Sequence, residues 1–164
     1  MGGSIVHVNI SRGGVPKRPI AEGFVSPLGI EGDVHAHPQV HGGPRQAVLL
    51  ISSEDIEHLA SQGYPVYPGA LGENLTTRGI DFRQLRSGQR WRAGQAVIEL
   101  TKIRVPCATL DVYGPAIKSE IYDDEVKRGN VMSPKWARSG FYASVIQTGP
   151  VRPNDIIALL DQVV

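Results

Sequence analysis

The chain lacks several features that would mark a specialised class of protein. Cys107 is its only cysteine, so no disulfide can form within the chain, which suits a reducing compartment. It has no apolar run of about 18 residues, so we expect no membrane-spanning helix. The opening residues lack the basic and apolar regions of a secretory signal. The formal net charge of +1 favours neither nucleic acid nor a membrane as a partner. We therefore expect a cytoplasmic protein that acts on a small-molecule substrate.

The commonest catalytic motifs are also absent. The sequence contains no G-x-x-x-x-G-K or G-x-G-x-x-G, which argues against the usual nucleotide-binding loops. It contains no H-E-x-x-H and no G-x-S-x-G, which argues against zinc proteases and α/β-hydrolases. Any chemistry must therefore come from a less common arrangement of residues.

Glycine and proline are plentiful instead. Nineteen glycines and twelve prolines in 164 residues indicate short elements and many turns. Apolar patterns predict strands at residues 4–10, 20–25, 46–51, 89–91, 98–105, 141–147 and 155–160. Helices are expected between Ser52 and Gly63 and from Pro115 to Lys127. About eight strands without regular strand–helix alternation predict one domain over residues 1–164, a mainly-β barrel with a few peripheral α-helices.

Two long segments interrupt these elements, residues 29–45 and 64–79. Long ordered loops in a small domain are usually functional. We expect both loops to converge near Cys107.

Cys107 itself follows the strand predicted over residues 98–105. Pro106 ends strand pairing and presets a first helical turn, so Cys107 should lie at a strand-to-helix corner. Free amides there, with Arg104 nearby, would favour the thiolate. The interpretation is an accessible thiol of lowered pKa at the base of a polar pocket; the alternative is a buried cysteine that packs as a small hydrophobe.

Arg104 should point away from the barrel interior. Side chains alternate along a strand, so Ile103 and Val105 are the better candidates for the core. Arg104 on the opposite face could reach an anion bound beside Cys107. The alternative is a solvated surface arginine.

The two loops carry the other candidate ligands. The loop 29–45 holds Asp33, His35, His37 and His41, which could bind zinc but lack thiolates or fixed helical spacing. We favour a role for these side chains in hydrogen bonding and in orienting a substrate or cofactor. Residues 69–77 of the other loop offer backbone amides, an amide side chain and hydroxyls that could hold a polar ring or phosphate; the alternative is an ordinary turn.

Taken together, these segments resemble a known family. The sequences GIEGDVH and HGGPR, then PGALGENLTTRGID, then RVPC, and finally GFYASVIQTGPV occur in this order. They are similar to the MOSC domain, found at the C-terminus of molybdenum cofactor sulfurases and in stand-alone bacterial proteins. The resemblance spans roughly residues 29–160. It implies a β-barrel and a cysteine, matched by Cys107, that either ligates the molybdenum of the pterin cofactor (molybdopterin) or carries sulfur.

The resemblance also implies roles for other residues. A thiolate such as that of Cys107 suits molybdenum, which is a soft centre when a dithiolene holds it. Arg45 and Arg104 would hold the cofactor phosphate. The pterin edge would be bonded by Asn74, Thr76 and Thr77. The candidate proton donors are Asp33, His35 and His41.

Two functions remain open at this stage. One is an oxidoreductase that reduces N-hydroxylated compounds on a molybdenum centre held by Cys107, with electrons from a separate reductase. The other is a carrier that passes sulfur from a Cys107 persulfide, or the cofactor itself, to an acceptor enzyme. The sequence differs from the family at Gly88-Gln89 and at residues 153–155, turn positions that bear on loop geometry rather than on chemistry.

Overall fold

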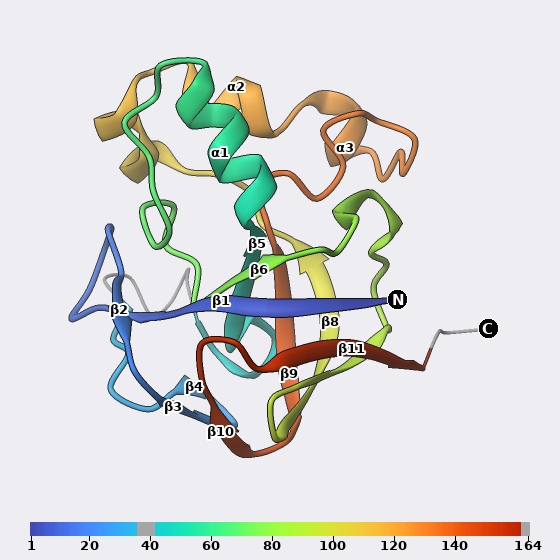
Figure 1. Ribbon diagram of the computed structural model, residues 1–164. Coiled ribbons are helices and arrows are strands. Elements are labelled where there is room, and N and C mark those ends of the chain that lie inside the picture. Colours follow the sequence, from blue (N-terminus) through green and yellow to red (C-terminus); the bar gives the residue numbers. More distant parts are fainter. Residues whose placement is uncertain (36–41, 162–164) are drawn as a thin grey trace.

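Seven strands close into a barrel in the computed structural model, which describes residues 1–35 and 42–161 (Figure 1). Around the ring they follow the order β11-β7-β8-β9-β5-β6-β1, and β1 pairs with β11 to close it. Neighbours are antiparallel except β5 and β6. The bounds are β1 Gly2–Ile10, β5 Val48–Ser52, β6 Leu75–Arg78, β7 Arg90–Ala93, β8 Ala96–Ile103, β9 Phe141–Gln147 and β11 Ile156–Asp161. The predicted mainly-β barrel is confirmed.

The remaining elements lie around this ring. Strand β2 (Arg18–Ile20) pairs with β1 outside the ring. A small second sheet has the order β10-β3-β4 (Gly149–Val151, Gly23–Ser26, Gly29–Ile30). The helices are α1 Ser53–Ser61, α2 Ile117–Ile121 and α3 Asp124–Lys127. Short 3-10 helices occur at η1 Pro44–Gln46, η2 Phe82–Gln84 and η3 Ala108–Tyr113. Figure 1 shows the three α-helices gathered at one end of the barrel. No helix in the described part of the chain has the length and apolar character that a membrane span needs.

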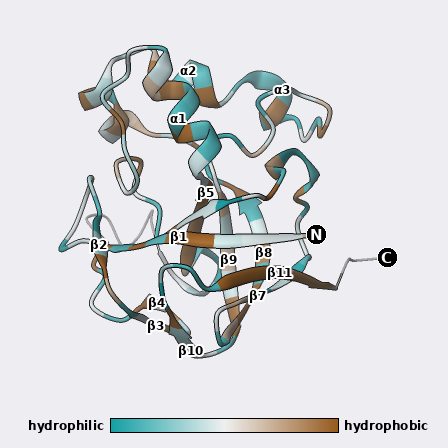
Figure 2. Ribbon diagram, in the orientation of Figure 1, coloured by the Kyte–Doolittle hydropathy of each residue, from teal (hydrophilic) through white to brown (hydrophobic). Residues whose placement is uncertain are grey.

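Strand β5 separates the two apolar clusters of the molecule. Val48 and Leu50 point into the barrel, while Leu49 and Ile51 point outward and pack beneath the helices. A strand whose residues alternate between two buried faces reads as a continuous apolar run, as this one does. Figure 2 shows such apolar stretches along β5 and β11, whereas the helices carry a mixture of residue types. The helical layer therefore rests on the outer face of β5.

Several predicted boundaries were wrong. Residues 20–25 form parts of two strands, because the chain turns between β2 and β3 and the latter pairs with β10. Residues 115–127 form two short helices, because Tyr122 and Asp123 are extended and the Asp123 carboxylate accepts the Val126 N–H to cap α3. The segment expected to be one loop, 64–79, contains β6, which pairs with both β5 and β1.

The helix predicted after Ser52 is confirmed, and its start can be tested. Ser52 Oγ accepts the Asp55 N–H at 3.0 Å, so Ser52→Ala should lower the free energy of unfolding by about 0.5–2 kcal/mol. Ser61, whose hydroxyl donates to the His58 carbonyl on the exposed end of α1, is the matched control. Chemical denaturation of both alanine variants measures this. An equal loss in the two would show that Ser52 does not act as a cap.

Candidate functional site

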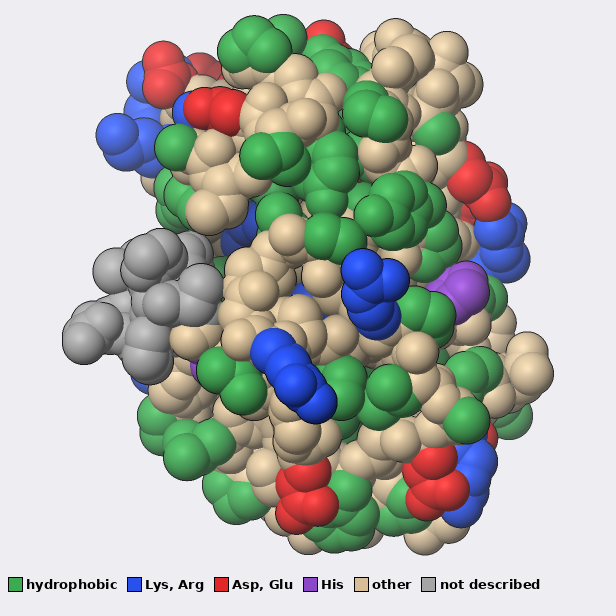
Figure 3. All heavy atoms as spheres, turned by 90° about the vertical axis from the view of Figure 1, so that its left-hand side faces the viewer, with side chains coloured by type: hydrophobic (Ala, Val, Ile, Leu, Met, Phe, Trp, Pro, Cys, Tyr) green, Lys and Arg blue, Asp and Glu red, His purple; other side chains and the backbone are tan. Residues whose placement is uncertain are grey.

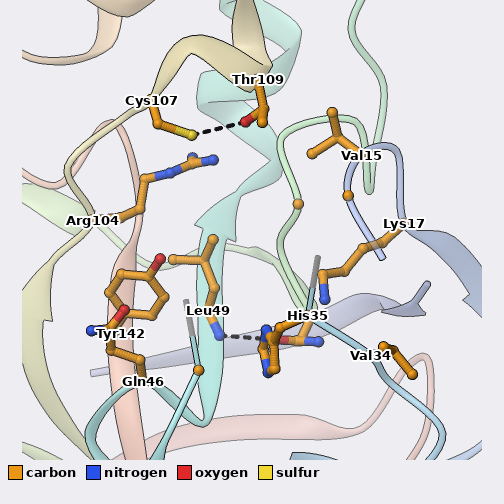
Figure 4. A pocket seen from close by; sticks show the side chains of 14 residues that line it. Val15, Lys17, Val34, His35, Gln46, Leu49, Arg104, Cys107, Thr109 and Tyr142 are labelled. Carbon is orange, nitrogen blue, oxygen red and sulfur yellow. Dashed lines mark hydrogen bonds between the residues drawn. The ribbon is translucent and has the colours of Figure 1, made fainter. Parts of the chain in front are cut away.

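One pocket brings together the segments that the sequence singled out (Figure 4). It encloses about 620 Å³ of empty space, part of it open to solvent. Its described lining comprises Gly14, Val15, Lys17, Val34, His35, Gly42, Gln46, Leu49, Gly72, Asn74, Arg104, Cys107, Thr109 and Tyr142. Both long loops and the segment after β8 contribute, so the predicted convergence near Cys107 is confirmed.

Cys107 lies where the sequence placed it, at the corner between β8 and η3. The strand ends at Ile103, and Cys107 is the residue before the first turn of η3. Its carbonyl accepts the Leu110 N–H at 3.1 Å, which fixes the turn. The thiol is half-buried, and Sγ lies 2.9 Å from Thr109 Oγ1. The buried-hydrophobe alternative is therefore wrong, since the thiol lines the pocket.

Arg104 is buried, with 5% of its surface exposed, so the surface-arginine alternative is wrong. Its guanidinium donates to the carbonyls of Leu71 (2.7 Å) and Ser139 (3.1 Å). The expectation for Val105 was also wrong, since this residue is 62% exposed: the strand has already ended and the face alternation no longer holds.

The charge of Arg104 is not neutralised by an ion pair with any carboxylate of the described residues. Burial lowers its pKa, but a guanidinium remains charged in proteins. A buried cation without an ion-pair partner is costly, so the pocket favours an anion next to Arg104. On the face shown in Figure 3, by contrast, positive and negative side chains are scattered over the surface.

Asp33 does not line the pocket but holds its walls together. Its Oδ1 accepts the Ser11 N–H at 2.9 Å, and its Oδ2 accepts from Lys17 Nζ (2.5 Å) and Asn74 Nδ2 (2.8 Å). Both charged side chains are buried, with 2% of Asp33 and 8% of Lys17 exposed. A carboxylate with three donors in a buried ion pair is a structural support, which is a different use from the proton donor the sequence suggested.

Asn74 lines the pocket, but its hydrogen-bonding groups already have partners. Its Nδ2 donates to Asp33 and to the Asn9 carbonyl, at 3.3 Å in the second case. Its Oδ1 accepts the Leu49 N–H at 3.1 Å. The amide therefore fixes the loop against β5 and β1 and has no N–H left for a pterin edge.

Three other predicted cofactor contacts do not reach the pocket. Thr76 and Thr77 are fully buried in β6 and are not among the lining residues. Thr76 Oγ1 donates to Glu73 Oε2 at 2.9 Å and accepts from Asn9. Arg45 is exposed in η1, and its neighbour Gln46 faces the pocket in its place.

Of the predicted histidines, His35 lines the pocket. Burial and, secondarily, the Lys17 charge lower its pKa, so the neutral imidazole predominates near pH 7. His37 and His41 lie outside the described residues. Within the described ranges 1–35 and 42–161 no group of three or more His, Cys, Asp or Glu side chains could hold a metal ion.

Sequence reasoning missed several residues of the lining, among them Lys17 and Tyr142. Lys17 occupies a loop without a recognisable motif, and only its contact with Asp33 reveals its position. Tyr142 belongs to β9 and was read as a strand residue, although it lies in the closing motif of the family resemblance. Burial raises the pKa of Tyr142 while the Arg104 charge opposes this. Its phenol is therefore a neutral donor in the pocket.

Comparisons with known proteins agree with the motifs. A family model described as MOSC domain matches residues 37–158. "Protein YiiM" of Escherichia coli is 28% identical over 144 residues, covering 85% of this chain and 60% of that protein. "Uncharacterized protein YflK" of Bacillus subtilis is 29% identical over 154 residues, covering 91% and 64%. The chain thus spans less than two-thirds of the length of these curated relatives.

Solved structures show the same fold. A crystal structure of YiiM from Escherichia coli is 25% identical, with a TM-score of 0.70, covering 99% of this chain and 71% of that one. A crystal structure described as a hypothetical protein has a TM-score of 0.72 at 28% identity, covering 99% and 70%.

The structural role of Asp33 predicts a large loss of stability on its removal. Asp33→Ala leaves a buried ammonium and an amide without their acceptor, so unfolding should become easier by about 3–5 kcal/mol. Glu57→Ala, which removes the partner of Arg78 in an exposed ion pair, is the control and should change stability little. Denaturant titration measures both. A fully stable Asp33→Ala protein would contradict the assignment.

The position of Cys107 predicts that its thiol reacts in the folded protein. Iodoacetamide should modify Cys107 without denaturant, because the thiol is half-buried and lines an open pocket. Mass spectrometry follows the rate of this modification. The unfolded protein supplies the reference rate. Modification only after unfolding would show that the pocket does not admit small molecules to the sulfur.

Proposed function

This chain belongs to the MOSC domain family, and on that premise we propose that its pocket binds the molybdenum cofactor with Cys107 as the thiolate ligand of the metal. The family is generally linked to this cofactor. The observation that carries the proposal is the juxtaposition, in one pocket, of a thiol and a buried arginine without an ion-pair partner among the described residues.

The residues present fit such a group. A thiolate is the soft ligand that molybdenum accepts, and Cys107 leaves the rest of the pocket for other ligands. The guanidinium of Arg104 suits an anionic part of the cofactor such as its phosphate. Gly72 keeps space in the pocket, because a side chain at this position would begin with a Cβ only 3.3 Å from Val15, another lining residue. Arg45, Thr76 and Thr77 are not part of this proposal, since they lie away from the pocket lining.

As the reaction we propose the reduction of N-hydroxylated compounds. The bound metal centre would supply the two-electron chemistry. The chain's own part is to hold the anionic group at Arg104 and to deliver a proton, for which His35 is the described candidate on the pocket lining. A single cysteine cannot ligate an iron–sulfur cluster, so electrons would come from a separate reductase.

A carrier of sulfur or of the cofactor is the second candidate. The observation in its favour is exposure, since Cys107 stands on an outer turn between the exposed residues Val105 and Thr109. A persulfide there would be within reach of an acceptor enzyme. A carrier would need Cys107 but would tolerate the loss of His35.

Elemental analysis of protein made in a host that synthesises the cofactor tests the proposal. The parent should carry molybdenum and Cys107→Ser should not. Arg104→Met should retain roughly ten- to a hundredfold less cofactor at limiting supply, the effect of one charge-assisted hydrogen bond. Arg138→Met, which removes a partly exposed arginine paired with Asp55, is the matched control and should retain the metal.

The variants also separate the two candidates. If His35→Gln keeps its molybdenum but loses the reduction of an N-hydroxylated substrate, the oxidoreductase is supported. A protein without metal but with cyanide-labile sulfur on Cys107 would favour the carrier.

Because Arg104 also binds two carbonyls, its variant should melt at a lower temperature than the parent, so cofactor content is compared at a temperature where both are folded.

A further inference from the structure

One further buried charged residue, Glu73, is not explained by the sequence motifs. It is fully buried and forms no ion pair with any described residue. Its Oε2 accepts the Gly69 N–H at 3.0 Å and the Thr76 hydroxyl at 2.9 Å. Its Oε1 has no hydrogen-bond partner among the described residues. An ionised carboxylate in this position would leave one of its two oxygens without a hydrogen-bond donor.

The neighbouring Asn9 has the same deficit. Its Nδ2 donates to the Glu73 carbonyl and to Thr76 Oγ1, so the two side chains belong to one cluster. Its Oδ1 also has no partner among the described residues. Two acceptors without donors in one buried cluster make the ionised form of Glu73 costly. Protonation lowers this cost, because it turns a carboxyl oxygen into a donor.

Among the described residues, one cation, Arg104, acts on Glu73. Burial raises the pKa of Glu73, and the Arg104 charge opposes this to a smaller degree. From η3 comes Tyr113, whose pKa burial raises to about 12, so it is neutral in the physiological range. Strands β1 and β6 contribute the uncharged Asn9 and Thr76.

The positive charge of Arg104 can therefore interact with a negative charge at Glu73 or with an anion in the pocket. On one side its Nη2 donates to the carbonyl of Leu71, in the loop that continues through Gly72 to Glu73. On the other side it lines the pocket. An anion in the pocket and an ionised Glu73 would compete for the same positive charge. The two binding events, of an anion and of a proton, are then thermodynamically linked.

We propose that Glu73 takes up a proton when an anion occupies the pocket beside Arg104, and that it thereby sets the charge of the ligand that the pocket accepts. With Glu73 neutral, the positive charge of Arg104 is available to an anion such as a phosphate group. With Glu73 ionised, the pocket is less positive and binds the anion more weakly. This inference rests on the proposed binding of an anionic group in the pocket.

Sulfate is a suitable probe because its charge stays fixed across the range tested. Calorimetric titration of the unliganded protein in two buffers of different ionisation enthalpy counts the protons taken up, which should reach up to about one per sulfate between about pH 5 and 8. Infrared difference spectra, with and without sulfate, should show a new absorption from a protonated carboxyl group. This measurement requires no variant, so it stands even if a substitution prevents folding.

Three variants assign the proton. Glu73→Gln mimics the neutral acid and should lose the new carboxyl absorption. At a pH where Glu73 of the parent is ionised, this variant should bind sulfate about fivefold or more tightly than the parent. Asp55→Asn removes another carboxyl group whose pKa burial raises, at the start of α1, and should behave like the parent. His35→Gln removes the imidazole of the pocket. Protonation of that imidazole would also attract sulfate, but it would give no carboxyl absorption.

Two results would overturn the inference while leaving the anion pocket intact. These are sulfate binding by the parent without proton uptake, and a carboxyl absorption that persists in Glu73→Gln. A different result would remove its premise, namely a parent that does not bind sulfate, or an Arg104→Met variant that binds it equally well. That outcome would contradict the proposed anion pocket together with the role of Glu73.

Discussion

The carboxylate of Asp33 is the interaction on which the pocket depends. It receives hydrogen bonds from two segments distant in sequence: the Ser11 amide and the Lys17 ammonium lie between β1 and β2, and the Asn74 side chain precedes β6. The loops that it joins have little regular structure there, so few backbone ladders could hold them. A buried ion pair contributes when its geometry is good and its remaining lone pairs are satisfied, and here they are. The barrel supplies a rigid base, but this carboxylate determines where the walls of the pocket stand.

The contrast between the two buried cations explains how the pocket can be both stable and receptive. Lys17 is neutralised by Asp33, so it adds little net charge to the pocket. Arg104 is held by two carbonyl groups, which fix its orientation without cancelling its charge. The nearest buried acid, Glu73, accepts from uncharged donors and can give up its charge by protonation. The protein thus separates the cation that builds the site from the cation that is left for a ligand.

Local patterns predicted those parts of the fold whose causes are local. The strand β1, the apolar run of β5 and the Ser52 cap were all visible in the sequence. Strand β6 was not, because Thr76 and Thr77 are polar residues inside the structure and their neighbours β1 and β5 lie far away in sequence. The same limit applies to the site. The motifs located the pocket. Which side chains remain for a ligand depends on the ion pair of Lys17 with Asp33 and on the hydrogen bonds of Asn74. These bonds join residues distant in sequence, so local patterns do not predict them.

The stretch from Gly69 to Asn74 shows why a motif can be characteristic of a site without touching its ligand. Gly69 adopts a positive φ, and a Cβ there would lie 2.2 Å from the Lys17 carbonyl oxygen, so only glycine allows the two backbones to meet. Its N–H is accepted by Glu73, and Asn74 fixes Asp33, so each polar residue supports another part of the wall. Chemistry toward a ligand is concentrated in the segment after β8, where Arg104 and Cys107 lie within four residues of each other. The stretch from Gly69 to Asn74 therefore shapes the cavity, and the segment after β8 supplies the side chains that face a ligand. A substitution in the first should change the second by moving the walls of the pocket.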